Sequence, residues 1–444
     1  MFPKVLAFVI TPIVKQFSAL QKGRNYIIAY GVIRRGFDML KVGIIGKTNT
    51  GKTTLFNAVT LLNAEISNYP FTTKSPNIGI GYVKTPCVHR EIGVKDNPKN
   101  STCLDGWRFI PIEVIDLPGL IKGAWEGAGL GNQFLSVAAQ ADALLHVVDA
   151  SGSINSKGAI CEPGMGSPLA DYYDIEEELI KWYTKNIMEN ADQVIRLLEG
   201  KNMDLTKAFL EVMAGIKVKE EHIKTALNRT KLGSIPLGDW EDEDFKSFAT
   251  EIRYLSKPTL IVANKMDMPV SEKNFQGLQE TFGEKFVIPC SADVELALRR
   301  AEKSGVISYV PGEEGFKIKD LSKVTPKQKW ALDYVKSRML DKWLRTGVDL
   351  ALSVTIFKLL MMNVVYPVED AKHYSDSKGN VLPDAYILPN GSTPFDLAKA
   401  IHSDLSEGFL YAIDATTGFR LPKDYTIRDR DVITIVSTRR KSKP

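Results

Sequence analysis

The spacing of apolar positions predicts a parallel sheet in the first part of the chain. Short apolar, β-rich segments alternate with helical stretches over residues 41–148, and the pattern returns at 259–263 and 285–289. Such alternation is typical of a parallel sheet covered by helices. The segments 78–83 and 109–115 are predicted to form an antiparallel pair at the sheet edge, joined by a long polar loop over 84–108.

Residues 171–256 have a helical pattern and interrupt the sheet. Asp174 followed by Glu177 predicts a helix start close to a capping box, and Gly200 predicts the stop. Between them one apolar face is formed by Ile180, Tyr183, Ile187, Ala191, Val194 and Leu198. Further helices are expected over 205–213, 220–229 and 242–255. Since the sheet pattern resumes afterwards, this block is interpreted as an inserted helical domain, with a solvated face favoured over a nucleic-acid surface.

The C-terminal third changes character twice. Helices are predicted over 326–344 and 350–360. After them, one helix over 393–403 is expected among strands, which are predicted at 363–368, 385–388, 409–414 and 432–437. Strands packed on a single helix indicate a small β-grasp-like α+β domain.

Composition adds three constraints. The 444 residues exceed what one core serves, so several domains are expected. There is no run of eighteen apolar residues, so no membrane span is predicted. The four cysteines, Cys87, Cys103, Cys161 and Cys290, form no C-x-x-C pair, which argues against a zinc ribbon and for a reducing, cytoplasmic setting. Cys87 and Cys103 could meet across a loop, but two separate thiols are favoured.

The first 38 residues are unusual because they carry six basic residues and one acid. One alternative is a signal peptide, although no convincing cleavage site follows. We favour Met39 as the true start, with the preceding residues arising from upstream translation. Without them the net charge falls from +4 to −1, so the basic balance is poor support for nucleic-acid binding.

The strongest chemical signal is Gly46-Lys47-Thr48-Asn49-Thr50-Gly51-Lys52-Thr53, which fits the phosphate-binding pattern G-x-x-x-x-G-K-[ST]. An apolar strand precedes it and a helix start, including Thr54, follows it. The glycines let successive N–H groups face one phosphate, and the helix N-terminus adds partial positive charge. Lys52 is expected to bind the outer phosphates and Thr53 the Mg²⁺ ion.

Two further motifs follow predicted strands. Asp116-Leu117-Pro118-Gly119 is a D-x-x-G pattern, in which Asp116 would hold Mg²⁺ through water and the Gly119 N–H would sense the γ-phosphate. Asn264-Lys265-Met266-Asp267 is an N-K-x-D pattern, and Ser291-Ala292 supplies another loop for the base. A carboxylate at Asp267 accepts hydrogen bonds from two guanine donors that adenine lacks, which favours GTP over ATP.

The segment between these motifs carries a family resemblance. Tyr69-Pro70-Phe71-Thr72-Thr73, then Pro76-Asn77-Ile78-Gly79, then the glycine-rich stretch after Asp116 resemble the Obg-type GTPases of the translation-factor class. The helical insertion and the C-terminal TGS domain resemble those of the YchF-like branch of this class, and the chain looks like an archaeal-type member of that branch. The resemblance implies that Thr73 binds Mg²⁺ when GTP is present. Many YchF-like proteins lack the base-specificity motif and prefer ATP, whereas this chain retains N-K-x-D.

The sequence indicates the residues for hydrolysis less clearly than those for nucleotide binding. Leu120 stands where Ras-like enzymes have a glutamine that orients water. Similar GTPases use an asparagine at the position of Asn49 to ligate K⁺; the alternative is that Asn49 only shapes the loop. Slow intrinsic hydrolysis is expected, on the order of 10⁻⁴ to 10⁻² per second. Gly119, Gly123, Gly127, Gly129 and Gly131 are interpreted as a second switch rather than a passive loop.

Together these patterns predict an α/β fold. It consists of a P-loop NTPase (Ras-like) sheet with an inserted helical domain and a C-terminal β-grasp-like α+β domain. The expected boundaries are an extension at 1–38, a GTP-binding domain at 39–152 and 257–305, helical insertion 153–256, helical connector 306–360 and TGS-like domain 361–440.

The predicted function is a GTPase switch linked to the ribosome or an RNA through the TGS-like and helical domains. The protein is expected to be a monomer and to have no membrane as a partner. The alternatives are an ATP-hydrolysing regulatory protein in stress signalling and a protein whose nucleotide is structural. The predicted nucleotide-binding residues are Gly46, Lys47, Thr48, Asn49, Thr50, Gly51, Lys52, Thr53, Thr54, Asp116, Gly119, Asn264, Lys265, Asp267, Ser291 and Ala292. The predicted catalytic residues are Lys52, Thr73, Gly119 and Asn49, and the predicted metal ligands are Thr53, Thr73 and Asp116.

Overall fold

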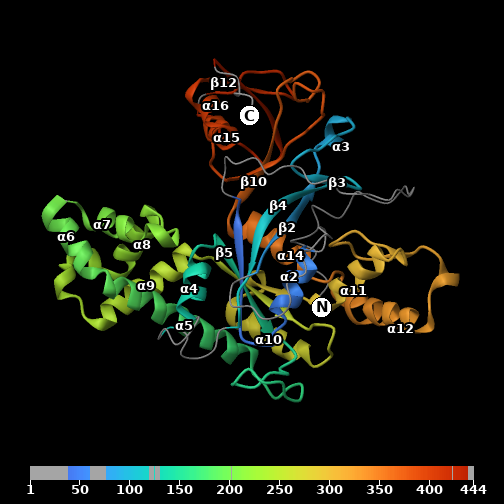
Figure 1. The fold of residues 1–444 in the computed structure, drawn as a ribbon, viewed down its shortest axis with the longest axis horizontal. Helices are drawn as coiled ribbons and strands as arrows, with labels where there is room; N and C mark the ends of the chain where they lie inside the picture. The colour runs from blue at the N-terminus through green and yellow to red at the C-terminus, as the bar shows by residue number, and fades with distance from the viewer. Residues whose placement is uncertain are drawn as a thin grey trace. The chain divides into compact units, whose positions relative to one another are not determined.

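The chain folds into two compact units, described here separately (Figure 1). The computed structural model describes residues 39–60, 77–119, 125, 131–201, 203–422 and 424–438. The larger unit comprises residues 38–83 and 111–362, and the smaller comprises 84–110 and 363–444 together with 1–37, which lie outside the described residues. The expectation about Met39 as the start therefore stays a prediction.

A sheet in the order β2-β4-β1-β5-β6-β7 lies at the centre of the larger unit, and β3 pairs with β4. β1 runs parallel to both β4 and β5, and β5–β6 and β6–β7 are also parallel pairs. The strands are β1 (Lys41–Ile45), β2 (Asn77–Pro86), β3 (Thr102–Leu104), β4 (Trp107–Asp116), β5 (Ala143–Asp149), β6 (Thr259–Asn264) and β7 (Val287–Pro289). The predicted parallel sheet is confirmed, with β2 at its edge beside β4.

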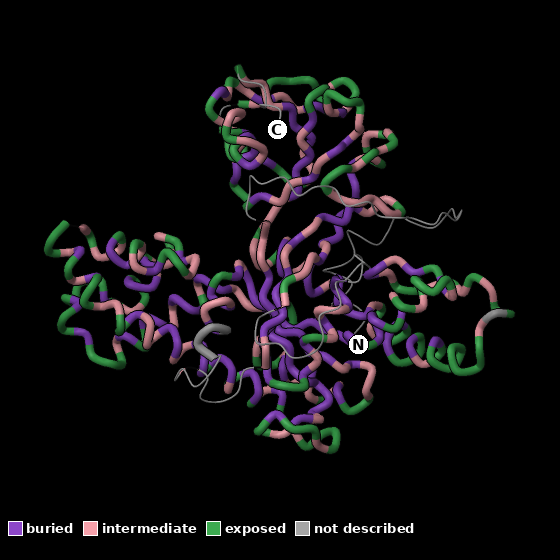
Figure 2. Tube along the Cα trace, in the orientation of Figure 1, coloured by how far each residue is buried: buried purple, intermediate pink, exposed green. Residues whose placement is uncertain are grey.

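Apolar side chains explain why the central strands are buried. Every residue of β5 is buried, as are four of the five in β1, so neither strand shows the alternation of a half-exposed strand. Figure 2 shows this burial running along the central strands. α2 (Lys52–Thr60) follows β1, α4 (Gly131–Ala139) connects β4 to β5, α10 (Ser271–Phe282) connects β6 to β7, and α11 (Ala292–Lys303) follows β7. Because crossover connections bring each parallel strand back in the same direction, the loops that follow the strands and carry the nucleotide motifs lie together at the carboxyl edge of the sheet.

The inserted block is helical as predicted, but its first helix starts earlier and ends sooner. Ser167 is the N-cap of α5 (Pro168–Glu189), with its side chain accepting from the Ala170 N–H and Pro168 at the first position. The predicted start at Asp174 is therefore wrong, because the Ser-Pro signal lies seven residues upstream. The predicted stop at Gly200 lies within one residue of the end of α6 (Ala191–Lys201). Asn190 breaks the predicted single apolar face into two helices.

The other inserted helices match their predicted positions closely. They are α7 (Leu205–Val212), α8 (Glu220–Thr230) and α9 (Asp242–Ser256), and with α6 they form one group, green in Figure 1. Phe209, Trp240 and Phe248 pack against one another in its core. The same core continues to Ile45 and Leu144 of the sheet, so the insertion is packed onto the sheet through one hydrophobic cluster.

The region after α11 is less regular than predicted. Instead of one helix over 326–344, α12 (Pro326–Val335) passes through a π-helical turn, Lys336–Leu340, into the short α13 (Asp341–Trp343). α14 (Val348–Val354) likewise continues as a π-helical turn, Thr355–Leu359. A small antiparallel pair, β8 (Ile307–Ser308) and β9 (Lys317–Ile318), precedes them.

The smaller unit contains a second sheet in the order β11-β10-β13-β12. β10 and β13 are parallel, and β12 and β13 are antiparallel. Its elements are β10 (Met362–Pro367), β11 (Tyr386–Pro389), α15 (Pro394–Ile401), α16 (Ser403–Glu407), β12 (Phe409–Asp414) and β13 (Asp431–Ser437). Leu397 and Ala400 of α15 pack on Val365 and Ile433 of the sheet, which confirms the predicted α+β domain. The single helix predicted over 393–403 is instead two, because His402 ends α15 and caps α16.

The predicted long polar loop over 84–108 is partly ordered secondary structure within the smaller unit. It holds α3 (His89–Ile92) and β3, and its backbone bonds to the C-terminal residues: Asn97 N donates to Val381 O over 2.8 Å. Asn100 and Ala385 exchange two further hydrogen bonds of 3.0 and 2.9 Å. Among the residues described in both units, no helix is long and apolar enough to cross a membrane.

Candidate nucleotide-binding site

The phosphate loop connects β1 to α2 as the sequence predicts. Gly46 has φ +144° and Gly51 φ +95°, and a Cβ atom at Gly46 would lie 2.3 Å from Val147 O. At Gly51 it would lie 2.2 Å from Asn264 Nδ2. Only glycine fits at these two positions, because a side chain would collide with β5 or with the base-recognition loop.

Lys52 lies buried at the start of α2, with Nζ donating to Lys47 O over 2.8 Å. Burial lowers the pKa of Lys52 to about 8, an effect that nearby Asp116 opposes. Thr50 Oγ1 donates to the same Lys47 carbonyl over 3.0 Å. The ammonium group thus binds the loop's own backbone, in a position from which a phosphate could take it over.

The residues predicted to hold Mg²⁺ lie together. Thr53 Oγ1 donates to Asp116 Oδ2 over 2.9 Å, and Asn77 Nδ2 lies 3.5 Å from the same oxygen. Among the described residues Asp116 Oδ1, though buried, has no hydrogen-bond partner. Burial raises the pKa of Asp116 against the opposing effects of Thr53 and Lys52. A hydroxyl beside an unsatisfied carboxylate oxygen fits a hydrated Mg²⁺ ion.

Two loop residues make contacts that the motif did not predict. The Lys47 Nζ atom lies 2.7 Å from Asp171 Oδ1 and 3.1 Å from Asp174 Oδ2 of α5. Burial alone would lower the pKa of Lys47, but the hydrogen bonds to both acids outweigh it and raise that pKa. Asn49 has φ +66° and its Nδ2 donates to Gly158 O over 2.9 Å. Both side chains therefore contact the inserted segment, which leaves the backbone of the loop to face a phosphate.

Asn264 joins the base loops to the phosphate loop. Its Nδ2 donates to Thr50 O over 2.9 Å, and its Oδ1 accepts from Ala292 N over 3.0 Å. Lys265, in the left-handed region at φ +66°, donates from Nζ to Asp149 Oδ2 over 2.9 Å. A single buried amide thus holds together three segments, of which the phosphate loop lies 214 and the Ala292 loop 28 residues from Asn264 in the chain.

The carboxylate of Asp267 is half-buried at the same edge. Ser291 Oγ donates to its Oδ1 over 2.6 Å, and Tyr334 Oη of α12 lies 3.3 Å from its Oδ2. Ser291 also caps α11, accepting from Val294 N over 3.4 Å. The arrangement provides a fixed acceptor for ring N–H donors, with one oxygen held by serine and the other facing a displaceable hydroxyl.

Comparisons with known proteins agree with this geometry. The model of a family described as 50S ribosome-binding GTPase matches residues 41–195. That of the Obg-like GTPase YGR210-like, G4 motif-containing domain matches 262–370, and that of the TGS domain matches 378–437. GTP-binding protein MJ1332 of Methanocaldococcus jannaschii is 44% identical over 399 residues, covering 90% of this chain and 99% of that protein. The chain belongs to the YchF-like branch of the Obg-like GTPases.

Further similarities support the same family. A GTP-binding protein from Pyrococcus horikoshii OT3, solved as a crystal structure, has a TM-score of 0.71 and 32% identity, covering 90% of this chain and all of that one. The ribosome-binding ATPase YchF of Buchnera aphidicola is 29% identical over 375 residues, 84% of this chain and 87% of that protein. This Obg-like chain is thus a GTP-binding protein with a P-loop GTPase domain and a TGS domain.

Sequence reasoning missed a buried polar network beside the base loops of this Obg-like GTPase. Asp149, at the end of β5, accepts from the Ser151 and Ser153 hydroxyls over 2.5 and 2.7 Å and from Lys265. The D-x-S-x-S spacing after a strand is a turn signal that could have indicated it. Asp171 and Asp174 were visible only as helix-start residues, and nothing local pairs them with Lys47.

Some predicted site residues have a backbone role or lie outside the described part. Gly119 approaches the phosphate loop so closely that a Cβ would lie 2.5 Å from Thr48 Oγ1. Thr54 is the third residue of α2. Thr73, Leu120, Gly123, Gly127 and Gly129 lie outside the described residues, so the role of Thr73 as a Mg²⁺ ligand and the second switch stay predictions.

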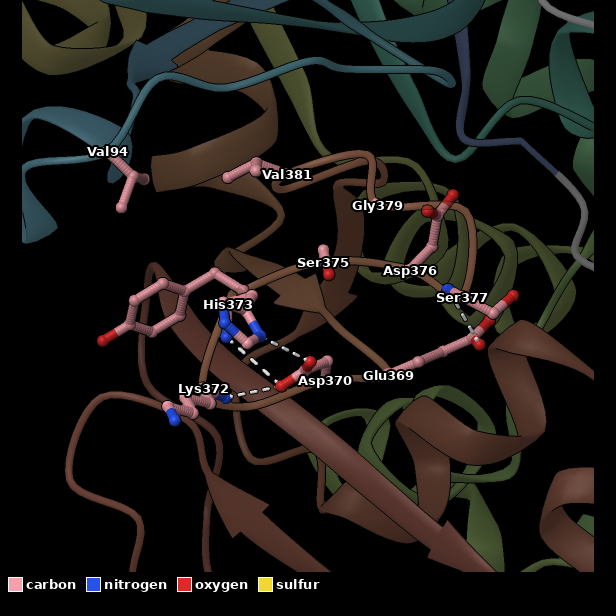
Figure 3. Close-up of a pocket in the computed structure, with 11 residues that line it drawn as sticks. Val94, Glu369, Asp370, Lys372, His373, Ser375, Asp376, Ser377, Gly379 and Val381 are labelled. Carbon is pink, nitrogen blue, oxygen red and sulfur yellow. Dashed lines mark hydrogen bonds and ion pairs between the residues drawn. The ribbon is translucent and has the colours of Figure 1, made fainter.

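A second polar hollow lies in the smaller unit but shows no comparable construction. Figure 3 shows side chains of residues 369–381 and Val94 around it. Its acidic groups have local partners: His373 Nδ1 lies 2.7 Å from Asp370 Oδ2, and Glu369 accepts from the backbone N–H of Ser377 over 3.2 Å. Because local partners occupy these groups, we assign no ligand to this hollow.

Proposed function

We propose that this Obg-like protein hydrolyses GTP to GDP and phosphate and acts as a nucleotide-dependent switch. The observation that carries the proposal is the Asn264 bridge, which ties the N-K-x-D loop and Ala292 directly to the phosphate loop. In this arrangement a base bound at Asp267 and a phosphate bound at Lys52 belong to one rigid site. The guanine donors suit the Asp267 acceptor, so ATP is not the favoured substrate.

The residues divide the chemistry among them. The N–H groups of residues 46–53 and the Lys52 ammonium would bind the phosphates, and Thr53 with Asp116 would hold Mg²⁺. When bound, Mg²⁺ supplies charge neutralisation at the phosphates. Gly119, within van der Waals distance of Thr48, is placed to sense the γ-phosphate through its N–H. Thr73 completes the proposed set.

How the attacking water is oriented is a separate part of the proposal. Asn49 is proposed as a ligand for K⁺, since its amide nitrogen is committed to Gly158 O and its amide oxygen is the acceptor such an ion needs. Single-turnover hydrolysis of GTP in potassium chloride and in sodium chloride tests this. Faster hydrolysis in potassium supports the ligand role, and equal rates leave Asn49 with a loop-shaping role only.

The proposed domains follow from the same assignment. GTP binding is proposed for residues 39–152 and 257–305, without 84–110, which belong to the smaller unit. Residues 153–256 are proposed as the helical insertion, 306–360 as connector and 361–440 as the TGS-like domain. The ribosome or an RNA is proposed as partner and the cytoplasm as location. The support is that the YchF relatives are named ribosome-binding ATPase and that the matching family is described as 50S ribosome-binding GTPase.

Three experiments separate the candidate functions. Affinities for GTP, GDP and ATP in Mg²⁺ buffer test the base assignment, and tighter ATP binding would contradict it. Cosedimentation with ribosomal subunits, with GDP and with a non-hydrolysable GTP analogue, tests the switch. Equal cosedimentation with both nucleotides would argue against a nucleotide-dependent switch, and slow hydrolysis of bound GTP in single turnover would distinguish an enzyme from a protein with a structural nucleotide.

A further inference from the structure

Four side chains of metal-ligating types converge in the smaller unit, in the stretch of chain between Thr73 and the D-x-x-G motif that begins at Asp116. They are Cys87 after β2, His89 at the start of α3, Asp96 in the following loop and Cys103 in β3. One ligand atom from each lies within 4.8 Å of all the others. Cys87 is buried and the other three are half-buried. The expectation of two separate thiols did not foresee this cluster, although both cysteines are free.

The separations match those around a four-coordinate Zn²⁺ ion. Zn–S bonds of about 2.3 Å and Zn–N or Zn–O bonds of about 2.0–2.2 Å place tetrahedral ligand atoms roughly 3.3–3.8 Å apart. Here Cys87 Sγ lies 3.3 Å from Asp96 Oδ2, Cys103 Sγ lies 3.5 Å from His89 Nδ1, and His89 Nδ1 lies 3.4 Å from Asp96 Oδ2. These three edges are already those of a coordination tetrahedron.

The backbone holds the ligands in place through short-range structure. Cys87 N donates to Gly106 O over 2.8 Å, and Cys103 pairs with Arg108 across the β3–β4 hairpin. Asp105 and Gly106 turn that hairpin with positive φ at both positions. Gly93 ends α3 at φ +72°, which directs the chain back toward Asp96. A site built on a hairpin and a capped helical turn is preorganised, so binding a metal would require little rearrangement.

The charge around the cluster fits a metal better than four protein groups alone. Arg108 has 0% exposure, and its Nη2 lies 3.3 Å from Asp96 Oδ2 and donates to Leu382 O over 3.0 Å. Two thiolates and a carboxylate around Zn²⁺ carry one net negative charge. One buried guanidinium beside them neutralises it, as a buried charge requires.

We propose that Cys87, His89, Asp96 and Cys103 form a structural Zn²⁺ site. Four protein ligands leave no open position, which is the arrangement of a structural rather than a catalytic zinc. Binding displaces the thiol protons to solvent and converts the cluster into a cross-link between the end of β2, α3 and β3. The loop that follows Asp96 binds residues 381–385, so the metal would stabilise the part of the smaller unit on which that segment rests.

The direct test is metal content of the full chain, purified without an affinity tag that binds metal, under reducing conditions and from zinc-supplemented cells. We expect about one zinc per chain by inductively coupled plasma mass spectrometry, in keeping with one four-ligand site. The double variant Cys87→Ser, Cys103→Ser should lose it. The matched control Cys161→Ser removes a half-buried thiol elsewhere and should retain it.

A second measurement does not depend on the variant folding. Wild-type protein stripped of metal and titrated with Co²⁺ should develop the visible bands of tetrahedral Co²⁺ together with thiolate-to-cobalt charge transfer, saturating at one equivalent. The proposal is overturned if wild-type protein neither copurifies with zinc nor shows these bands. Recovery of a Cys87–Cys103 disulfide peptide from protein kept under reducing conditions would also overturn it.

Discussion

The nucleotide site and the Cys–His cluster are both groups of polar side chains in the interior, yet they were unequally visible in the sequence. The nucleotide site gathers residues as distant as Thr50 and Asn264. The cluster gathers four residues between Cys87 and Cys103. The distant set was predicted and the near set was not. Whether a site can be predicted from the sequence therefore does not depend on how far apart its residues lie along the chain.

What differs is the source of the geometry. In the nucleotide site each segment positions its group by local backbone structure, as with Gly46 and Gly51, whose positive φ angles curl the loop. A strand end and a glycine loop give the same geometry wherever they occur, so the pattern can be recognised. The cluster depends instead on an irregular loop between Gly93 and Cys103 returning to β2, which no short pattern encodes.

The largest expected effect concerns Lys52. Replacing it with alanine removes the buried ammonium that would bind the outer phosphates, and we expect GTP affinity to fall roughly 100- to 1,000-fold, or about 3–4 kcal/mol. Titration with a fluorescent GTP analogue measures this. Lys41→Ala is a matched control, because Lys41 lies on β1 and pairs with Glu113 at 3.4 Å. Unchanged affinity in the Lys52 variant would place the phosphates elsewhere.

The next effect tests the base assignment. Asp267→Asn replaces one carboxylate acceptor with an amide donor, so guanine would meet a donor where it needs an acceptor. We expect GTP affinity to fall on the order of 100-fold and affinity for xanthosine triphosphate, which carries a carbonyl in place of the amino group, to rise. Asp293→Asn, an exposed acid in the first turn of α11, serves as control. Parallel losses for both nucleotides would show that Asp267 acts on folding and not on the base.

These two sites show how far the sequence reaches into the structure. The strand–loop–helix order, the sheet class and the base motif could be predicted because strand ends and glycine turns are local. The start of α5 was misplaced because Asp174 resembles a cap, whereas Ser167 with Pro168 is the cap that the chain uses. That error hid the contact of Asp171 and Asp174 with Lys47, which depends on the helix reaching back to the phosphate loop.

The boundary of the smaller unit could not be predicted for a related reason. Residues 84–110 look like a loop of the sheet, but they share a compact unit with 363–444. Their hydrogen bonds to residues 380–385 join segments more than 270 residues apart. Arg108 is polar in the sequence and has 0% exposure in the fold. Such a residue is buried only because segments distant in the chain pack together, and a local sequence pattern does not contain that information.

Removing zinc should affect the Cys–His cluster and leave the nucleotide site unchanged. A zinc-selective chelator that spares Mg²⁺ should lower the unfolding temperature of the smaller unit by roughly 10 °C, the shift for a loss of about 2 kcal/mol in a domain near 100 residues. GTP affinity should not change. The Cys87→Ser, Cys103→Ser variant should be insensitive to the chelator. A chelator effect of equal size in that variant would mean that the metal binds elsewhere.

A smaller effect links Lys52 to stability. Burial lowers the pKa of Lys52 in the folded protein to about 8, from its ordinary value of 10.5, so without nucleotide the unfolded chain binds the proton more tightly. This difference lowers the free energy of unfolding by its full amount below pH 8, and the reduction vanishes as the pH rises toward 10.5. Lys52→Met should therefore stabilise the nucleotide-free protein by about 1–3 kcal/mol at pH 7, and less at pH 9.5. Urea denaturation of the larger unit at the two pH values measures this; a gain that does not depend on pH would contradict the titration argument.

The smallest effect lies at Tyr334, whose hydroxyl is 3.3 Å from Asp267 Oδ2. Guanine must displace that hydroxyl to use the oxygen. Tyr334→Phe keeps the ring on α12 and removes the competitor, so GTP should bind about two- to fivefold more tightly, or roughly 0.5–1 kcal/mol. ATP, which does not need the acceptor, should show no gain, and Asp333→Asn on the exposed side of the same helix should change neither. Weaker GTP binding in the phenylalanine variant would instead make the hydroxyl part of the base site.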